Sequence, residues 1–162
     1  MTSRNGNSRG MRAMRTSPTH RAEYFSQTRK AHAHEVSEDY VETIADLLEE
    51  TGEARVVDLA ARLGVSHVTV SRTIARLQKA GLVASQPYRS IFLTAKGEDL
   101  AAASRKRHQT VVAFLRSLGI PGHVAEKDAE GIEHHVSPDT LSAFETILRR
   151  RGGTITPAPG RK

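Results

Sequence analysis

Residues 55–80 read RVVDLAARLGVSHVTVSRTIARLQKA, and in this stretch a glycine separates two short amphipathic segments. Residues 55–63 predict a first helix, which Gly64 closes. Ser66 can cap a second helix running to about Ala80, because its hydroxyl can accept a hydrogen bond from a free amide of the first turn. The buried side of that helix is predicted to carry Val70, Ile74 and Leu77. Two helices joined by such a turn predict a helix-turn-helix.

The segment that follows predicts a β-hairpin. Residues 82–85 and 90–93 are short β-prone runs around Gln86-Pro87-Tyr88-Arg89. A hairpin directly after the second helix makes the motif winged, with Arg89 at the wing tip. The candidate DNA contacts are therefore Ser66, His67, Thr69, Ser71, Arg72, Arg76, Lys79 and Arg89. Arginine can read guanine edges, whereas lysine, serine and threonine contact phosphates and so position the protein on the DNA backbone.

The distribution of charge favours a nucleic-acid partner for this region. The formal net charge is +6, and residues 1–34 alone hold seven basic side chains against the single acid Glu23. Residues 55–107 contain ten basic side chains and three acidic ones. Residues 35–54 hold eight acids and neither lysine nor arginine. This distribution indicates a polyanion partner in one place and a cation site in another. For residues 66–80 the alternative is a helix face that is merely solvated.

The composition excludes several classes of protein. With 162 residues and no cysteine, the chain can form one domain or two small ones, without disulfides or thiolate chemistry. There is no run of about 18 apolar residues for a membrane span, and the basic N-terminus lacks the apolar segment of a secretory signal. We expect a cytoplasmic protein.

The rest of the chain predicts more helices. Apolar spacing indicates a helix over residues 36–51, and Thr94 can cap a long helix to about Leu118. Pro121 opens a helix to about His135, and Ser137-Pro138 begins a last one to Arg151. We expect a mainly α protein with four parts: a disordered basic tail (1–34), a winged helix-turn-helix domain (35–93), a linker helix with a helical domain (94–151) and a disordered tail (152–162).

Residues 128–136 read DAEGIEHHV and group potential metal ligands. On a helix, Glu130, Glu133 and His134 are three and four residues apart and share a face, whereas His135 lies about 100° further round. The spacing matches neither HExxH nor its inverse. A surface charge cluster is the alternative.

Three further positions are candidates for the same chemistry. Asp39 and Glu42 are three residues apart on the first helix, and His108 lies inside the long helix. Taken singly, the acids are typical of a helix N-terminus, and the histidine is typical of capping or packing. The pair His32 and His34 is interpreted as incidental.

Together these motifs resemble the manganese-transport regulators, the short branch of the diphtheria-toxin-repressor family of metal-dependent transcriptional repressors. The resemblance rests on EGIEHH (130–135), DYVE (39–42), the helix-turn-helix and the histidine of the long helix, and it covers about residues 35–151. It implies a winged helix followed by a helical dimerisation domain. The metal ligands that it implies are Asp39, Glu42, His108, Glu130, Glu133 and His134.

The resemblance implies Mn²⁺ as co-repressor, and the donor chemistry agrees. Four carboxylates and two imidazoles suit Mn²⁺, tolerate Fe²⁺ or other divalent metals, and leave room for two ions. The expected function is a manganese-responsive repressor whose homodimer binds palindromic operators of metal-transport genes. The candidate dimer interface, with intradomain core as the alternative, comprises Leu115, Leu118, Ile120, Leu141, Phe144, Ile147 and Leu148. The rival functions are a metal-independent winged-helix regulator that senses a small molecule, and a metal hydrolase with Glu133 as base.

Overall fold

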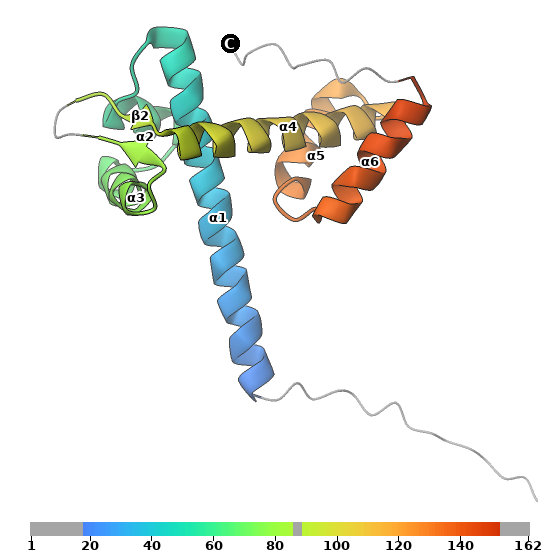
Figure 1. Ribbon diagram of the computed structural model, residues 1–162, viewed down its shortest axis with the longest axis horizontal. Coiled ribbons are helices and arrows are strands. Elements are labelled where there is room, and N and C mark those ends of the chain that lie inside the picture. The colour runs from blue at the N-terminus through green and yellow to red at the C-terminus, as the bar shows by residue number, and fades with distance from the viewer. Residues whose placement is uncertain (1–17, 86–88, 153–162) are drawn as a thin grey trace, which may run out of the picture.

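The computed structural model describes the backbone of residues 18–85 and 89–152, and the side chains of residue 26 and of residues 32–85 and 89–152. Its order is α1 (Pro18–Thr51), α2 (Val56–Leu63), α3 (His67–Lys79), β1 (Val83–Ala84), β2 (Phe92–Leu93), α4 (Ala95–Ser117), α5 (Gly122–Ile132) and α6 (Pro138–Arg150). Figure 1 shows α4 extending from the α1–β2 region toward α5 and α6. None of the helices in these ranges is long and apolar enough to cross a membrane.

The helix-turn-helix forms as expected. Gly64 ends α2 in the left-handed conformation, with φ of 66°. Ser66 then caps α3, because its hydroxyl accepts a hydrogen bond from the Thr69 amide. The predicted wing is also confirmed, although its strands are short: Val83 pairs with Leu93 and Ala84 with Phe92 in an antiparallel register.

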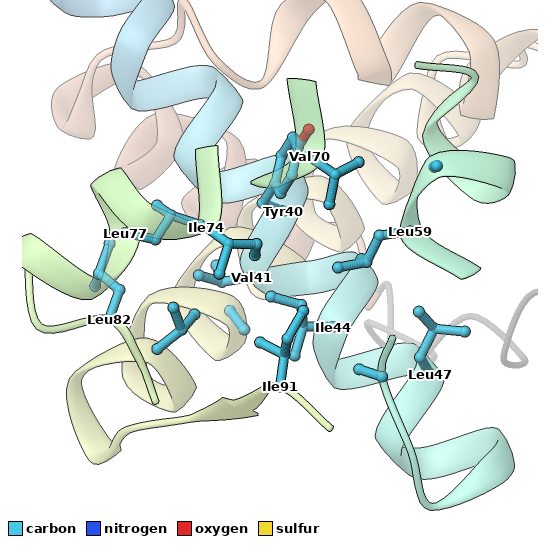
Figure 2. Close-up of a cluster of buried hydrophobic side chains, with 14 residues drawn as sticks. Tyr40, Val41, Ile44, Leu47, Leu59, Val70, Ile74, Leu77, Leu82 and Ile91 are labelled. Atoms are coloured by element: carbon cyan, nitrogen blue, oxygen red, sulfur yellow. The ribbon is translucent and has the colours of Figure 1, made fainter. Parts of the chain in front are cut away.

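The first core is shared by α1, α2, α3 and the wing. Figure 2 shows the labelled side chains from α1 meeting those from α2, α3 and the wing. This cluster includes Tyr40, Val41, Ile44, Leu59, Val70, Ile74, Leu77 and Ile91. The buried positions predicted for residues 66–80 are thus confirmed.

The second core lies between α4, α5 and α6. Val111, Val112, Ala125 and Ala129 are its buried members. The rings of Phe114 and Phe144 stack beside it, with centroids 3.8 Å apart. Ser137 caps α6 as expected, by accepting a hydrogen bond from the Thr140 amide. The mainly α fold is confirmed.

The beginning of α4 is fastened to the end of α3. The Thr94 hydroxyl caps α4 and also donates a hydrogen bond of 2.7 Å to the Gly81 carbonyl. Lys96 donates a second, of 2.9 Å, to the Ala80 carbonyl. Gly97 is buried against the Leu82 backbone, so closely that a Cβ there would collide with the Leu82 carbonyl oxygen. The start of α4 is therefore attached to the residues that directly follow α3.

The start of α1 corrects one expectation. Residues 1–34 were expected to be disordered, but α1 begins at Pro18. Proline suits the first position of a helix, and residues 19–51 contain neither glycine nor proline to interrupt one. Apolar periodicity detects only helices with a buried face, and in Figure 1 the early part of α1 projects away from the other helices. The rest of the predicted N-terminal tail, residues 1–17, lies outside the described residues. So do residues 153–162 of the predicted C-terminal tail.

Candidate metal centre and DNA-facing helix

Side chains from three segments meet where α1, α4 and α5 come together. Glu133 follows α5 directly and is 4% exposed. Its carboxylate lies 2.6 Å from Nδ1 of His108 on α4 and 3.5 Å from Nε2 of His134. Helix α5 ends earlier than expected, at Ile132, but Glu133 keeps a right-handed helical conformation. Its side chain therefore stays on the helix face that carries Glu130.

His134 connects this centre to α1. Its Nε2 lies 3.5 Å from the Asp39 carboxylate, and its Nδ1 lies 3.0 Å from the carboxylate of Glu38. Its side chain is 7% exposed. His135, in contrast, is exposed, as the helical spacing predicted. The centre thus contacts the helix that packs against α3.

Glu42 and Glu130 complete the group of predicted residues. The Glu42 carboxylate accepts a hydrogen bond from the Ser104 hydroxyl and is close enough to Glu133 and His108 for electrostatic interaction. The charge of Glu130 acts on both Asp39 and His108. The structure therefore brings all six predicted positions together, and their role as metal ligands stays a prediction.

The electrostatics of the centre indicate an excess of negative charge. Burial, and then the charges of neighbouring acids, raise the pKa of Asp39 and of Glu42 above their ordinary values. Hydrogen bonds that His108 donates to Glu133 and Glu126, opposed by burial, raise its pKa to about 9. The histidine is therefore a cation at neutral pH in this arrangement, and it offsets part of the carboxylate charge.

The donor chemistry fits a divalent cation. Carboxylate oxygens and imidazole nitrogens without sulfur are the ligands that Mn²⁺ shares with other first-row metals. Within the part of the chain that the structure describes, no group of three such side chains is already arranged around a common point. Their polar atoms instead pair with one another, as in the contact between His108 and Glu133. A cation would replace these contacts.

Three functional neighbours were missed from the sequence. Glu38 is 2% exposed and forms a 2.6 Å ion pair with Arg107, and Glu126 lies 3.0 Å from Nε2 of His108. Although burial opposes it, the contact with charged Arg107 and the hydrogen bond with His134 lower the pKa of Glu38. Helical spacing offered a signal, because Glu38 precedes Glu42 by four residues and Glu126 precedes Glu130 by four.

The histidine pair on α1 is close to the centre without entering it. His34 is 63% exposed, and its Nε2 lies 3.2 Å from the Glu38 carboxylate. His32 is 74% exposed and pairs with Glu35. Both contacts join neighbouring turns of one helix. The interpretation of this pair as incidental to the metal centre stays a prediction.

All eight candidate DNA contacts lie on the surface. Residues 66, 67, 69, 71, 72, 76 and 79 are exposed on or beside α3, and Arg89 is exposed in the wing. Among the described side chains, Arg72, Arg76 and Lys79 take part in no ion pair. The positive charge of this face is therefore available to a polyanion.

The candidate dimer residues divide into two groups. Leu148 is 3% exposed, and Leu115, Ile120, Leu141 and Phe144 pack around the second core. Ile147 is half-buried. Leu118, at the end of α4, is 54% exposed. Most of these side chains thus serve the core within the protomer, whereas Leu118 is left on the surface.

Two family models match most of the chain. The model for "Iron dependent repressor, N-terminal DNA binding domain" matches residues 32–91. The model for "Iron dependent repressor, metal binding and dimerisation domain" matches residues 94–151. The proposed ligands come from both matched segments.

Relatives with assigned names are similar along most of their length. The transcriptional regulator MntR of Escherichia coli O157:H7 is 53% identical over 130 residues, which are 80% of this chain and 84% of the relative. The HTH-type transcriptional regulator MntR of Bacillus subtilis (strain 168) is 39% identical over 112 residues, 69% of this chain and 79% of the relative.

Solved structures share the fold. A manganese-dependent transcriptional repressor in complex with manganese has a TM-score of 0.63 and 30% identity, over 70% of this chain and 52% of its own. The manganese regulator SloR has a TM-score of 0.62 and 27% identity, over 77% of this chain and 63% of its own. The chain thus spans less than two thirds of either structure.

Proposed function

The chain belongs to the iron-dependent repressor family, and from that premise we propose that it is a manganese-responsive, DNA-binding transcriptional repressor. One observation carries the proposal: the candidate ligands join α4 and α5 to α1, which shares a buried core with α3, the proposed recognition helix. A cation held there bears directly on the position of α3. The relatives named MntR and the manganese-bound structure support the choice of metal.

The proposed ligands are Asp39, Glu42, His108, Glu130, Glu133 and His134. Their carboxylates can bridge, so the set has room for two Mn²⁺ ions, and Fe²⁺ or other divalent metals also suit it. Manganese would supply positive charge that offsets the mutual repulsion of the acids. The burial that raises the pKa values of Asp39 and Glu42 also makes their charged forms costly without a cation.

The proposed mechanism couples the acids to the recognition helices. Without the cation, repulsion between the acids of α1 and those of α5 loosens the contact between the DNA-binding half and the rest of the chain. When the repulsion is removed, Asp39 and Glu42 hold α1 against His108 and Glu133. The population then shifts toward the arrangement in which two recognition helices of a dimer fit DNA, and DNA tightens metal binding by the same factor.

The proposed DNA partner is a palindromic operator read by a homodimer. Arg72 and Arg76 are suited to base edges or phosphates, and Ser66, His67, Thr69, Ser71 and Lys79 to positioning on the backbone. Arg89 in the wing is suited to a neighbouring phosphate. The exposed Leu118 is our first candidate for the contact between protomers, and the half-buried candidates stay with it: Leu115, Ile120, Leu141, Phe144 and Ile147. Residues 35–93 and 94–151 are the proposed domains. Because the proposed partner is DNA, we also propose a cytoplasmic location.

The rival functions have less support. A small-molecule sensor would leave the convergence of ligands from α1, α4 and α5 without a purpose. A hydrolase would need Glu133 to reach a substrate, yet this carboxylate is 4% exposed and lies against His108. We therefore propose regulation rather than turnover.

The test is a comparison of DNA affinity with and without Mn²⁺. Duplexes are first selected from a random-sequence pool with the full chain and MnCl₂, and their affinity is then measured by fluorescence anisotropy with MnCl₂, with MgCl₂ and with a chelator. We expect tight, palindromic binding only with MnCl₂. Equal affinity after chelation would eliminate the metal switch, and selection of no duplex would eliminate specific DNA binding.

A further inference from the structure

We propose that Glu38 and Glu126 are positioning residues, each of which holds one ring nitrogen of a ligand histidine so that the other nitrogen faces the metal. This inference rests on the proposed function and deepens it. It assigns Nε2 of His134 and Nδ1 of His108 as the metal-binding atoms. It also gives roles to two acids outside the six proposed ligands.

The first half of the argument is the environment of His134. Its Nδ1 lies 3.0 Å from the Glu38 carboxylate, whereas its Nε2 lies 3.5 Å from both Asp39 and Glu133. A histidine bound to a metal through one nitrogen carries its proton on the other, and that proton needs an acceptor. Glu38 is the acceptor on the Nδ1 side. Nε2 is left among the proposed ligands.

The second half is the environment of His108, where the two nitrogens exchange roles. Its Nε2 lies 3.0 Å from the Glu126 carboxylate, and its Nδ1 lies 2.6 Å from that of Glu133. The side chain is 12% exposed, so the ring has little freedom to turn. In both histidines, the nitrogen beside Glu133 is thus the one that Glu38 or Glu126 does not contact. Both assigned nitrogens converge on one buried carboxylate.

Glu38 is itself held in place. Its 2% exposed carboxylate pairs at 2.6 Å with Arg107, which is 20% exposed. Arg107 precedes His108 in α4, so one ion pair fastens α1 to α4 beside the ligands. An acid fixed in this way can orient His134 before any cation arrives. Glu126, at 46% exposed, has more freedom.

The experiment reads the protonated nitrogens directly. Long-range ¹H–¹⁵N NMR spectra of the full chain loaded with diamagnetic Zn²⁺ distinguish a metal-bound ring nitrogen from a protonated one. We expect the proton on Nδ1 of His134 and on Nε2 of His108. Metal bound through the opposite nitrogen of either ring would overturn the assignment for that histidine and its acid.

Affinity for Mn²⁺, measured by counting free Mn²⁺ with EPR, tests the energetic role. Glu126→Ala removes a half-exposed acid and should weaken Mn²⁺ binding by about 10- to 100-fold while the fold persists. For the buried pair, the double variant Glu38→Gln, Arg107→Gln removes both charges and leaves no lone buried ion. It should weaken Mn²⁺ binding and give a mixture of His134 tautomers.

A matched control separates this role from a general loss of surface charge. Glu145→Gln removes an acid of α6 that pairs with Lys106 and Arg149 and forms no ion pair with either histidine. We expect wild-type affinity from this control. Wild-type affinity in the Glu38 and Glu126 variants as well would overturn the positioning roles alone. Failure of the unaltered chain to bind Mn²⁺ would overturn the proposed function and this inference together.

Discussion

Nδ1 of His108 lies 2.6 Å from the Glu133 carboxylate, the shortest contact between a histidine and an acid in the centre. The two residues belong to α4 and to the end of α5, so this contact joins two segments of the proposed metal site. In the metal-free chain a proton on His108 occupies a position that the proposed cation would take. We therefore expect protons and Mn²⁺ to compete for this pair of residues.

The first prediction concerns the pH dependence of the metal-free chain. The pKa of His108 is raised to about 9 in the folded state, against 6.5 for an unperturbed histidine. The stability that His108 contributes is therefore complete below pH 6.5 and is lost as the pH rises through about 9. Urea unfolding of the chelated chain across this range should show the loss, and His108→Gln should flatten it. A stability that rises over this window would contradict the pKa of His108.

The second prediction concerns stabilisation by the metal. With free Mn²⁺ at a hundred times its Kd, one bound ion should stabilise the fold by about 2.7 kcal/mol. Glu133→Gln keeps the size of the side chain but removes the charge, so Mn²⁺ should no longer raise Tm. Differential scanning calorimetry with and without MnCl₂ measures the difference, and Glu145→Gln should respond like the unaltered chain. A normal response of Glu133→Gln would remove Glu133 from the ligand set.

The third prediction concerns α3. Arg72→Ala or Arg76→Ala should weaken operator binding by about 1–3 kcal/mol if the side chain reads a base, and the loss should depend on sequence. If the side chain contacts a phosphate, the loss should be uniform across sequences, with a reduced salt dependence. Arg149→Ala on α6 is the control with an equal change in charge. Losses no greater than that of the control would show that DNA binds elsewhere.

The fourth prediction concerns Gly97. Alanine normally stabilises a helix by about 1 kcal/mol relative to glycine. At this position its Cβ would collide with the Leu82 carbonyl, so Gly97→Ala should instead destabilise the fold by about 1–3 kcal/mol. Gly122→Ala, in a helix with open space around the glycine, should be neutral or stabilising. Urea unfolding compares the two, and equal effects would mean that α4 moves easily away from the wing.

The sequence predicted the elements whose signals are local. Ser66, Thr94 and Ser137 cap helices where expected, because a cap depends only on the residues of its own first turn. The early part of α1 was missed, because residues 1–34 show little apolar periodicity, the signal from which the other helices were predicted.

The candidate site divides in the same way. Glu130, Glu133 and His134 were predictable as a group because helical spacing puts them on one face. The partnership of Glu38 with His134 spans 96 residues, and the packing of α1 against α4 and α5 decides it. From the sequence, only the resemblance to a family predicted that Asp39, His108 and Glu133 belong to one site.

The fastening of α4 to the end of α3 gives the long helix a mechanical role. His108 lies fourteen residues after Thr94, roughly 20 Å along a continuous helix axis. Thr94 and Lys96 donate hydrogen bonds to the carbonyls of Gly81 and Ala80, so the first turn of α4 is attached to the residues that end α3. We therefore expect a tilt of α4 at His108 to be passed along the helix to the end of α3, about 20 Å away, and so to change how α3 meets DNA.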